Sequence, residues 1–220
     1  MSGSLRLTTI RERRVLTPIG WVTLSMAFGL ALVSFILFIH PFLAPIKPVE
    51  GRILVVQGLF SDYEIEKVKG RFEKGNYELL VVVGKELETD HPLAQYKNMA
   101  NWAISKYKVL GVPEGEIIPI SFKPPKINRT YYQALIVQKK FNEIGLTEIP
   151  IDVVSSSVHA RRTWILFEKV FSSVNVGIIA IYPNTYDASR WWLSSMGVRN
   201  VISESIAYIY ARFIFSPPIK

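Results

Sequence analysis

An uncharged apolar run near the amino terminus limits what this chain can fold into. Residues 19–39 (IGWVTLSMAFGLALVSFILFI) contain no Asp, Glu, Lys or Arg. About 20 apolar residues in a helix, rising about 1.5 Å each, cross a hydrocarbon layer of about 30 Å. Trp21 and the pair His40-Pro41 suit the two interfaces. The run predicts a transmembrane helix over 19–40. A cleaved signal peptide is the alternative, although its apolar region would be shorter, about 7–15 residues.

The cations that flank this run predict its orientation. Four arginines precede it: Arg6, Arg11, Arg13 and Arg14. Only Lys47 follows it closely, so the positive-inside rule leaves the amino terminus in the cytoplasm. We expect a single-pass protein of a bacterial cytoplasmic (inner) membrane, with its large domain outside or periplasmic. The chain then divides into a basic cytoplasmic segment (1–18), the transmembrane helix (19–40), a Pro-rich spacer (41–50) and a folded domain (51–220).

Composition excludes several classes of protein for the remainder of the chain. Hydrophobic residues make up 49% and charged residues 20% of the 220 residues, so the chain is not disordered. The absence of cysteine excludes disulfides, thiolate metal sites and a cysteine nucleophile. The net charge is +8, of which +3 lies before Gly20. The other +5 is diffuse and forms no basic helix face, which argues against nucleic acid and fits small anions or lipid headgroups.

Apolar runs alternate with amphipathic stretches through the remainder of the chain. The runs are RILVVQG, ELLVVVG, EIIPIS, IDVVSS and VGIIAIY, each rich in Val and Ile. Such runs are typical of strands that are covered on both faces. Segments 62–74, 93–109, 129–144, 159–171 and 200–214 have the pattern of helices. We therefore expect an α/β domain with a Rossmann-like, doubly wound, mostly parallel sheet of about five strands. Thr89-Asp90 and Asn128 are expected to cap the second and third helices.

Parallel sheets bind ligands beyond the carboxyl ends of their strands, where helix amino termini present free amides. Two of the predicted strands end in glycine, at Gly58 and Gly84, and another ends in Ser155, Ser156 and Ser157. Glycine would let a ligand approach the backbone, and serine would donate hydrogen bonds. The chain lacks GxGxxG, GxxxxGK[ST] and GxSxG, so the usual dinucleotide, P-loop and hydrolase interpretations lose support.

The segment SSSVHARR (155–162) concentrates the chemistry. His159 and Arg162 are three residues apart and share one helix face, whereas Arg161 is turned about 100° away from Arg162. An arginine fork beside helix amides and hydroxyls suits phosphate or carboxylate, and a histidine there can donate a hydrogen bond or act as acid or base. The plain alternative is that the serines cap the helix and the cations are solvated. A metal site or a triad of Ser156, His159 and Asp187 has less support.

Over about residues 50–215, the chain resembles the ElyC/SanA/YdcF family of envelope-associated Rossmann-like domains. The features that carry the resemblance stand in order: VVQG, VVVG, GVPEGEI (111–117), NRTYYQA with Thr130, S-x-x-H-x-x-R (156–162) and Glu204 in the last helix. HARR, YDASRWWLSSMGVRNVISE and AYIYARF look like a membrane-anchored subgroup. The chain departs from the family at Gln57, where many relatives are acidic, and at SDYEIE, where many have arginine.

The resemblance implies a functional pocket that contains His159 and Arg162, with Glu204 as the partner of one of these cations. Together with the strand ends, it gives the candidate ligand-binding residues Gly58, Gly84, Thr130, Ser155, Ser156, Arg162 and Glu204. His159 is the candidate acid or base, and the candidate rim residues are Gln57, Asp62, Asp187 and Trp192.

The expected function is binding or processing of an anionic, phosphate-bearing envelope metabolite, with a role in envelope or polysaccharide biogenesis. The ligand would be a sugar phosphate, a nucleotide-like molecule or a lipid-linked intermediate, and no cofactor is specified. The alternative is a non-catalytic, membrane-tethered interaction factor that contacts envelope proteins through the Trp-rich 186–199 segment and the last helix.

Overall fold

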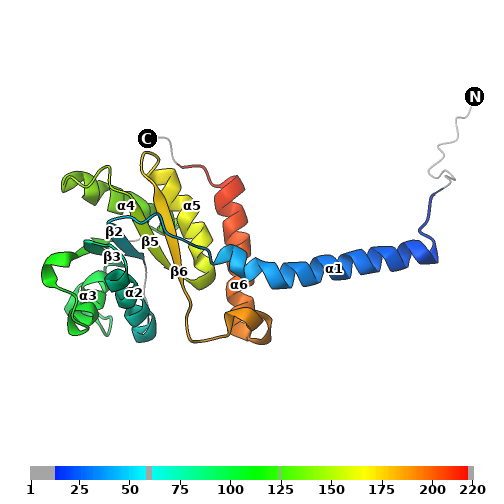
Figure 1. Cartoon of the computed structure of the whole chain (residues 1–220), viewed down its shortest axis with the longest axis horizontal. Helices are drawn as coiled ribbons and strands as arrows, with labels where there is room; N and C mark the ends of the chain where they lie inside the picture. Colours follow the sequence, from blue (N-terminus) through cyan, green and yellow to red (C-terminus); the bar gives the residue numbers. More distant parts are fainter. Residues whose placement is uncertain (1–12, 58–60, 124, 218–220) are drawn as a thin grey trace, which may run out of the picture. The chain divides into compact units, whose positions relative to one another are not determined.

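The computed structural model describes residues 13–57, 61–123 and 125–217 (Figure 1). Two compact units divide the chain, residues 1–37 and 38–220. The second unit is an α/β domain, and it includes the last turn of the amino-terminal helix. We describe each unit by itself.

The domain is built on a six-stranded sheet in the order β1-β6-β5-β2-β3-β4. The strands are β1 (Ile46–Lys47), β2 (Ile53–Gln57), β3 (Leu79–Lys85), β4 (Ile117–Phe122), β5 (Ile151–Ser156) and β6 (Val176–Ile181). All neighbours pair in parallel except β1, which is antiparallel to β6. The predicted doubly wound, mostly parallel sheet is therefore confirmed. The two-residue edge strand β1 was not expected, because it is too short to show a pattern.

Helices cover both faces of the sheet (Figure 1). They are α2 (Asp62–Lys74), α3 (Met99–Val109), α4 (Arg129–Glu143), α5 (Ala160–Val170) and α6 (Ser195–Ile209), which continues as the π-helical turn η5 (Tyr210–Ile214). Val55 and Val81 pack against α4 and α5 on one face, and Leu54 and Val82 pack against α2 and α3 on the other. The alternation along each central strand thus fills two cores, which explains why the strand sequences are apolar throughout.

Two expected helix starts, at 93 and 200, and two expected caps, Thr89-Asp90 and Asn128, are wrong. The predicted helix 93–109 is a short turn, η1 (Ala94–Tyr96), followed by α3, whose amino end is capped by Asn98 rather than by Thr89-Asp90. Asn128 precedes α4 but caps nothing with its side chain, because its φ of 55° places it in the left-handed region. The last helix starts at Ser195, capped by Ser194, five residues earlier than expected.

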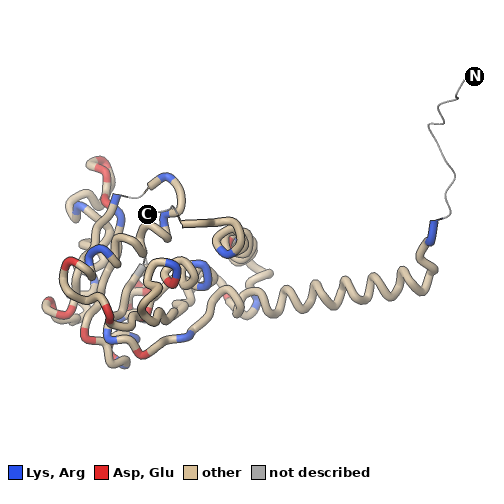
Figure 2. The backbone as a smooth tube through the Cα atoms, turned by 90° about the horizontal axis from the view of Figure 1, so that it is seen from above, with Lys and Arg blue, Asp and Glu red and all other residues tan. Residues whose placement is uncertain are grey.

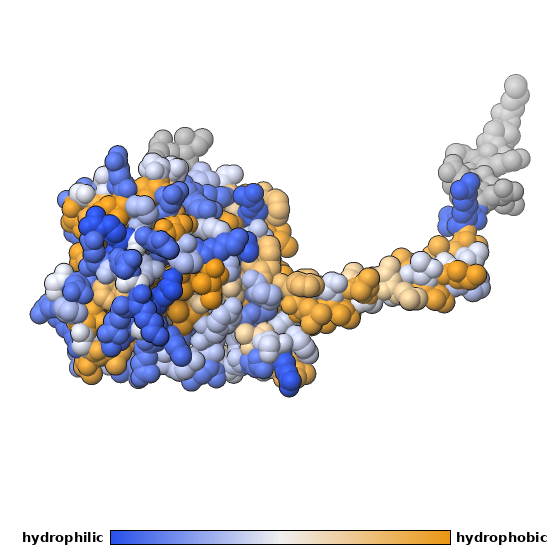
Figure 3. Space-filling view, in the orientation of Figure 1, coloured by the Kyte–Doolittle hydropathy of each residue, from blue (hydrophilic) through white to orange (hydrophobic). Residues whose placement is uncertain are grey.

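The amino-terminal helix α1 runs from Pro18 to Leu43 and is long and apolar enough to cross a membrane. It contains no Asp, Glu, Lys or Arg, and the nearest described cations before it are Arg13 and Arg14 (Figure 2). Its surface in Figure 3 is largely hydrophobic. At about 1.5 Å per residue, its 26 residues span about 39 Å, which exceeds the hydrocarbon layer.

The stretch after α1, predicted as a spacer, is packed into the domain. Leu43 and Ala44 are buried, and the next residues form β1. The carboxylate of Asp152, fully buried on β5, accepts hydrogen bonds from Val49 N at 2.8 Å and from Gly51 N at 3.3 Å. A buried carboxylate is stable only when its oxygens are satisfied, so Asp152 fixes the entry of the chain into the sheet.

Candidate functional site

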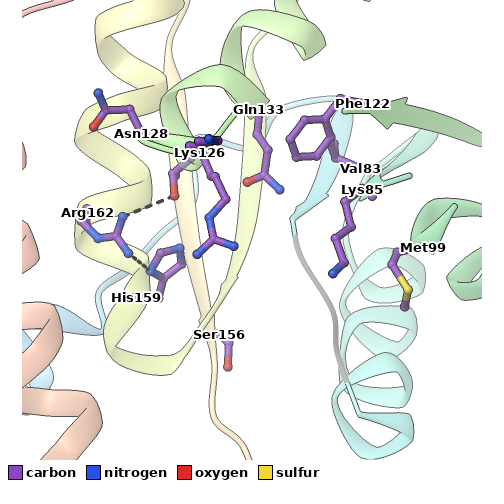
Figure 4. Close-up of a pocket in the computed structure, with 13 residues that line it drawn as sticks. Val83, Lys85, Met99, Phe122, Lys126, Asn128, Gln133, Ser156, His159 and Arg162 are labelled. Atoms are coloured by element: carbon purple, nitrogen blue, oxygen red, sulfur yellow. Dashed lines mark hydrogen bonds between the residues drawn. The ribbon is translucent and has the colours of Figure 1, made fainter. Parts of the chain in front are cut away.

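A cavity of about 550 Å³ opens at the carboxyl ends of β3, β4 and β5 (Figure 4). The described residues that line it are Val83, Gly84, Lys85, Met99, Phe122, Lys126, Asn128, Arg129, Thr130, Gln133, Ser156, His159 and Arg162. Parallel α/β sheets bind ligands at this edge, because strand ends and helix amino termini converge there. The cavity is therefore the candidate functional site.

Ser155 and Ser156, which end β5, have different surroundings. Ser155 is buried, and its Oγ lies 3.1 Å from Thr163 Oγ1, so it joins β5 to α5 inside the core. Ser156 lines the cavity, and its Oγ donates to Glu64 Oε1 at 2.9 Å. Glu64 also accepts from Ser61 N and completes the capping box of α2. Of Ser155 and Ser156, only Ser156 is placed to meet a ligand.

Ser157 connects the site to the end of α1. Its φ of 42° lies in the left-handed region, and its Oγ is 2.9 Å from Tyr186 Oη. The same tyrosine oxygen is 3.2 Å from His40 Nε2. Because the short helix η3 (Ser157–His159) begins at this serine, these contacts fix the backbone from which His159 projects.

His159 and Arg162 meet a carboxylate from a distant helix. Arg162 donates from Nε to Glu204 Oε2 at 2.8 Å and from Nη2 to Oε1 at 2.9 Å. The same Nη2 lies 2.8 Å from His159 Nδ1, which is 3.1 Å from Glu204 Oε1. A bidentate arginine–carboxylate pair of this kind has a fixed geometry. The chain thus brings together α5 and α6 at the three residues that the resemblance singled out.

The contacts of His159 Nδ1 allow two proton arrangements. As an acceptor from Arg162 it is unprotonated, so the ring proton sits on Nε2. In the other tautomer Nδ1 carries the proton, and Nδ1–H donates to Glu204 Oε1. His159 also lines the cavity, so its imidazole is placed to exchange a hydrogen bond or a proton with a ligand.

Glu204 remains ionised over the whole physiological range. Burial raises the pKa of this carboxyl, but hydrogen bonds from His159 and Arg162, with the charges of both, lower it to about 2. The carboxylate side chain is 18% exposed, so water screens the pair only partly. Glu204 does not line the cavity, and its role is to hold the two residues that do.

Thr130 opens α4 beside this cluster. Its Oγ1 accepts from Arg162 Nη1 at 3.4 Å, and both side chains line the cavity. Figure 4 shows Arg162 and His159 on one side of the cavity and Lys85 on the opposite side. A ligand between them meets cations from two directions.

Sequence reasoning missed three cations of the site: Lys85, Lys126 and Arg129. All three are exposed and line the cavity. None of them forms a salt bridge within the part of the chain that the structure describes. Lys85 is the last residue of β3, Lys126 lies between β4 and α4, and Arg129 is the first residue of α4. The search of strand ends that found Gly84 could therefore also have found them. With Arg162, four cationic side chains line the cavity, and none of its described lining residues is acidic.

Of the two glycines expected at strand ends, the structure describes only Gly84. Gly58 lies outside the described residues, and Gln57 ends β2 but its side chain is not described. Gly84 lines the cavity, and a Cβ there would lie 2.1 Å from Ala100 N. Gly84 therefore has a packing role as well, because it admits the amino terminus of α3 against β3.

Three predicted rim residues lie away from the lining. Asp62 is exposed on α2 and pairs with Lys106 at 3.2 Å. Asp187 accepts from Ser189 N at 2.8 Å and caps η4 (Ala188–Leu193), so the carboxylate that contacts His159 is Glu204. Trp192 packs edge-on against Trp191 and is partly exposed.

Arg161 contacts a different part of the domain from Arg162, as their 100° separation predicts. Its guanidinium lies 4.0 Å from the ring centre of Phe42, and its Nε donates to the Phe42 carbonyl. Arg161 therefore holds the last turn of α1 against α5 and leaves the cavity to Arg162.

Comparisons of the chain with known proteins leave the site to be judged on its own chemistry. Neither the models of known protein families nor the curated proteins gave a match to this sequence. Within the described residues, no group of three His, Asp or Glu side chains is arranged to hold a metal ion.

Proposed function

We propose that this domain binds a phosphate-bearing small molecule or lipid-linked phosphate in the cavity beyond β3, β4 and β5. The observation that carries the proposal is the charge of the lining. Arg162, Arg129, Lys126 and Lys85 face a space of about 550 Å³ without a lining carboxylate among the described residues. Such a cluster repels itself, and an anion relieves the repulsion.

The arrangement assigns roles to individual side chains. Arg162 is held rigidly by Glu204, so its remaining donor Nη1 is fixed beside Thr130. A preorganised donor loses little entropy when a phosphate oxygen arrives. Lys126 and Arg129 sit on the exposed side, where they attract the anion and adapt to its size.

His159 is the candidate for any proton transfer. It lines the cavity, and its Nδ1 lies 3.1 Å from Glu204 Oε1, which orients the ring. We propose that it donates a hydrogen bond to the bound phosphate or acts as its acid or base, with the backbone at Gly84 and the hydroxyls of Thr130 and Ser156 completing the site. Ser155 supports this arrangement from the core.

The cellular setting is part of the proposal. The four arginines before α1 support a cytoplasmic amino terminus, and the resemblance to the ElyC/SanA/YdcF family supports a bacterial envelope role for the outward-facing domain. A carboxy-terminal alkaline phosphatase fusion is expected to be active. An inactive phosphatase fusion together with a fluorescent GFP fusion would reverse the orientation.

The binding proposal is tested by thermal unfolding of the full chain in detergent with sugar phosphates, nucleotides and polyprenyl phosphates. The full chain is used because Leu43, Ala44 and β1 belong to the folded domain. A ligand at about 100 times its Kd stabilises a protein by about 2.7 kcal/mol. We expect such a ligand to stabilise the native chain and the control Lys139→Gln, but Arg129→Gln less. If no phosphate compound in the panel raises the Tm, the proposal is wrong.

The alternative, a tethered interaction factor, is favoured by one observation. Trp192 and Met196 are partly exposed next to Leu193, which is 73% exposed. Exposed apolar residues that adjoin one another are typical of partner surfaces. Under this alternative, Trp192→Ala abolishes co-purification of an envelope protein, and Arg129→Gln has no effect.

A further inference from the structure

The outer face of α6 carries a stripe of exposed apolar side chains. Val198, Ile202, Ile206 and Ile209 follow one another at intervals of four, four and three residues. At about 100° per residue they fall within about 80° of one another on the helix surface. Phe213, 76% exposed in η5, extends the stripe. Each of the five is exposed, so among the described residues this face has no partner.

The opposite face of α6 is already used by the domain. Gly197, Val201 and Ala211 are buried, and Glu204 reaches Arg162 on α5. The apolar stripe is therefore not a core face that a small shift would bury, because the core side of the helix is occupied. Something outside the domain must cover the stripe if it is to leave water.

Beside the stripe, α6 contacts the last turn of α1. Phe42, in the last turn of α1, packs its ring edge-on against Tyr208 of α6 at 5.3 Å between centroids. Arg161 holds the same phenylalanine from α5. These residues all belong to the unit 38–220. α6 is therefore joined directly to the turn at which the predicted membrane span ends.

The charges beside the stripe agree with a lipid surface. Arg199 and Arg212 are exposed on its two flanks. Glu204 is the only acidic residue in 195–214, and it faces the domain interior. A helix with one apolar face, flanking arginines and no outward carboxylate matches an interface that has anionic headgroups above an acyl layer. Two copies of this face would instead bring like charges together.

We propose that α6 and η5 lie on the bilayer that α1 crosses, with the stripe Val198–Phe213 in the acyl boundary and Arg199 and Arg212 at anionic headgroups. The attachment through α1 makes this contact intramolecular, so a face of modest area is enough to keep it docked. Because Glu204 projects from the other side of α6, the docked helix holds the candidate site at a fixed distance from the membrane surface. The docking rests on α1 crossing the membrane and does not rest on the proposed ligand.

The experiment uses the natural absence of cysteine from the chain. Single variants Leu30→Cys, Ile206→Cys and Val109→Cys of the full chain are labelled with bimane and reconstituted in vesicles of phosphatidylcholine and phosphatidylglycerol. Leu30 lies within α1, and Val109 is an 85% exposed apolar residue at the end of α3. These two positions report insertion and exposure to water, respectively.

Brominated lipid is expected to lower bimane emission from positions 30 and 206 and to leave emission from position 109 unchanged. The loss of emission at position 206 should be at least half of the loss at position 30. Removal of phosphatidylglycerol should weaken the effect at 206 only. The proposal is overturned if position 206 behaves like position 109 while position 30 is quenched. It is also overturned if the label at 206 is shielded from aqueous iodide but not reached by brominated lipid, because a protein would then cover the stripe. Disulfide-linked Ile206→Cys chains would identify that protein as a second copy.

Discussion

Arg162 on α5 and Glu204 on α6 form a two-pronged ion pair, with Nε–Oε2 and Nη2–Oε1 distances of 2.8 and 2.9 Å. The pair joins two helices and fixes one wall of the candidate site. It therefore affects both the stability of the domain and the shape of the cavity, and the two effects can be measured separately.

Loss of the Glu204 charge should destabilise the domain. Glu204→Gln keeps the size of the side chain but leaves Arg162 without a counter-charge in a partly buried position. We expect the free energy of unfolding to fall by about 1–3 kcal/mol, measured by denaturant titration. The control is Glu143→Gln, which breaks an exposed pair with Lys140 and should cost less than about 0.5 kcal/mol. Equal losses in the two variants would contradict the account.

Stability should depend on pH through Glu204 in the acid range. The pKa of this carboxyl is about 2 in the folded domain, against an ordinary value of 4.5. Because the folded pKa is the lower one, its contribution is complete above about pH 5 and is lost as pH falls towards 2. The loss amounts to about 2–3 kcal/mol. Denaturation of the native chain and of Glu204→Gln from pH 6 downwards checks this, and parallel profiles would contradict it.

Gly84 should not tolerate a methyl group. A Cβ would meet the backbone of Ala100 and Met99, which the helix α3 holds in place. We expect Gly84→Ala to cost about 1–3 kcal/mol by thermal or chemical unfolding. Gly70→Ala is the matched control, because nothing lies within 4 Å of its Cβ position and alanine favours the helix. That variant should be neutral or more stable, and the prediction fails if both variants behave alike.

The hydroxyl of Ser157, the first residue of η3, should contribute to the stability of the domain. Ser157→Ala removes the hydroxyl that meets Tyr186, in a residue with a φ of 42°. We expect a loss of about 1 kcal/mol, because the tyrosine hydroxyl loses one partner. Ser105→Ala, which removes a hydroxyl bonded to the Trp102 carbonyl within α3, should cost less. Similar losses would show that the contact at Ser157 is not special.

The fold could be predicted from the sequence because its strong signals are local. Strands buried on both faces, such as 79–85, read as unbroken apolar runs, and the amphipathic pattern of 62–74 predicted α2 at the bounds that the structure shows. The features that were predicted wrongly or missed depend on contacts between residues far apart in the sequence. The two-residue β1 exists only because β6 offers an edge, and Asn128 is a left-handed turn residue rather than a cap.

The candidate site was predicted in part for the same reason. His159 and Arg162 are three residues apart, so their shared face follows from helix geometry. Their partner Glu204 is 42 residues beyond Arg162, and only the resemblance indicated it. Lys85, Lys126 and Arg129 converge because β3 and β4 end at one edge of the sheet and α4 begins after β4. Ser155 and Ser156 differ because strand side chains alternate, a rule that can assign two faces but not which face meets the cavity.

Titration calorimetry measures directly whether the cations around the cavity bind phosphate. The best compound from the thermal screen is titrated into the full chain, the double variant Lys126→Gln, Arg129→Gln and the control Lys139→Gln. We expect the double variant to keep its ligand-free Tm and to lose at least tenfold in affinity, about 1.4 kcal/mol. The control should bind as the native chain does. An unchanged Kd in the double variant would contradict the claim and place the phosphate elsewhere.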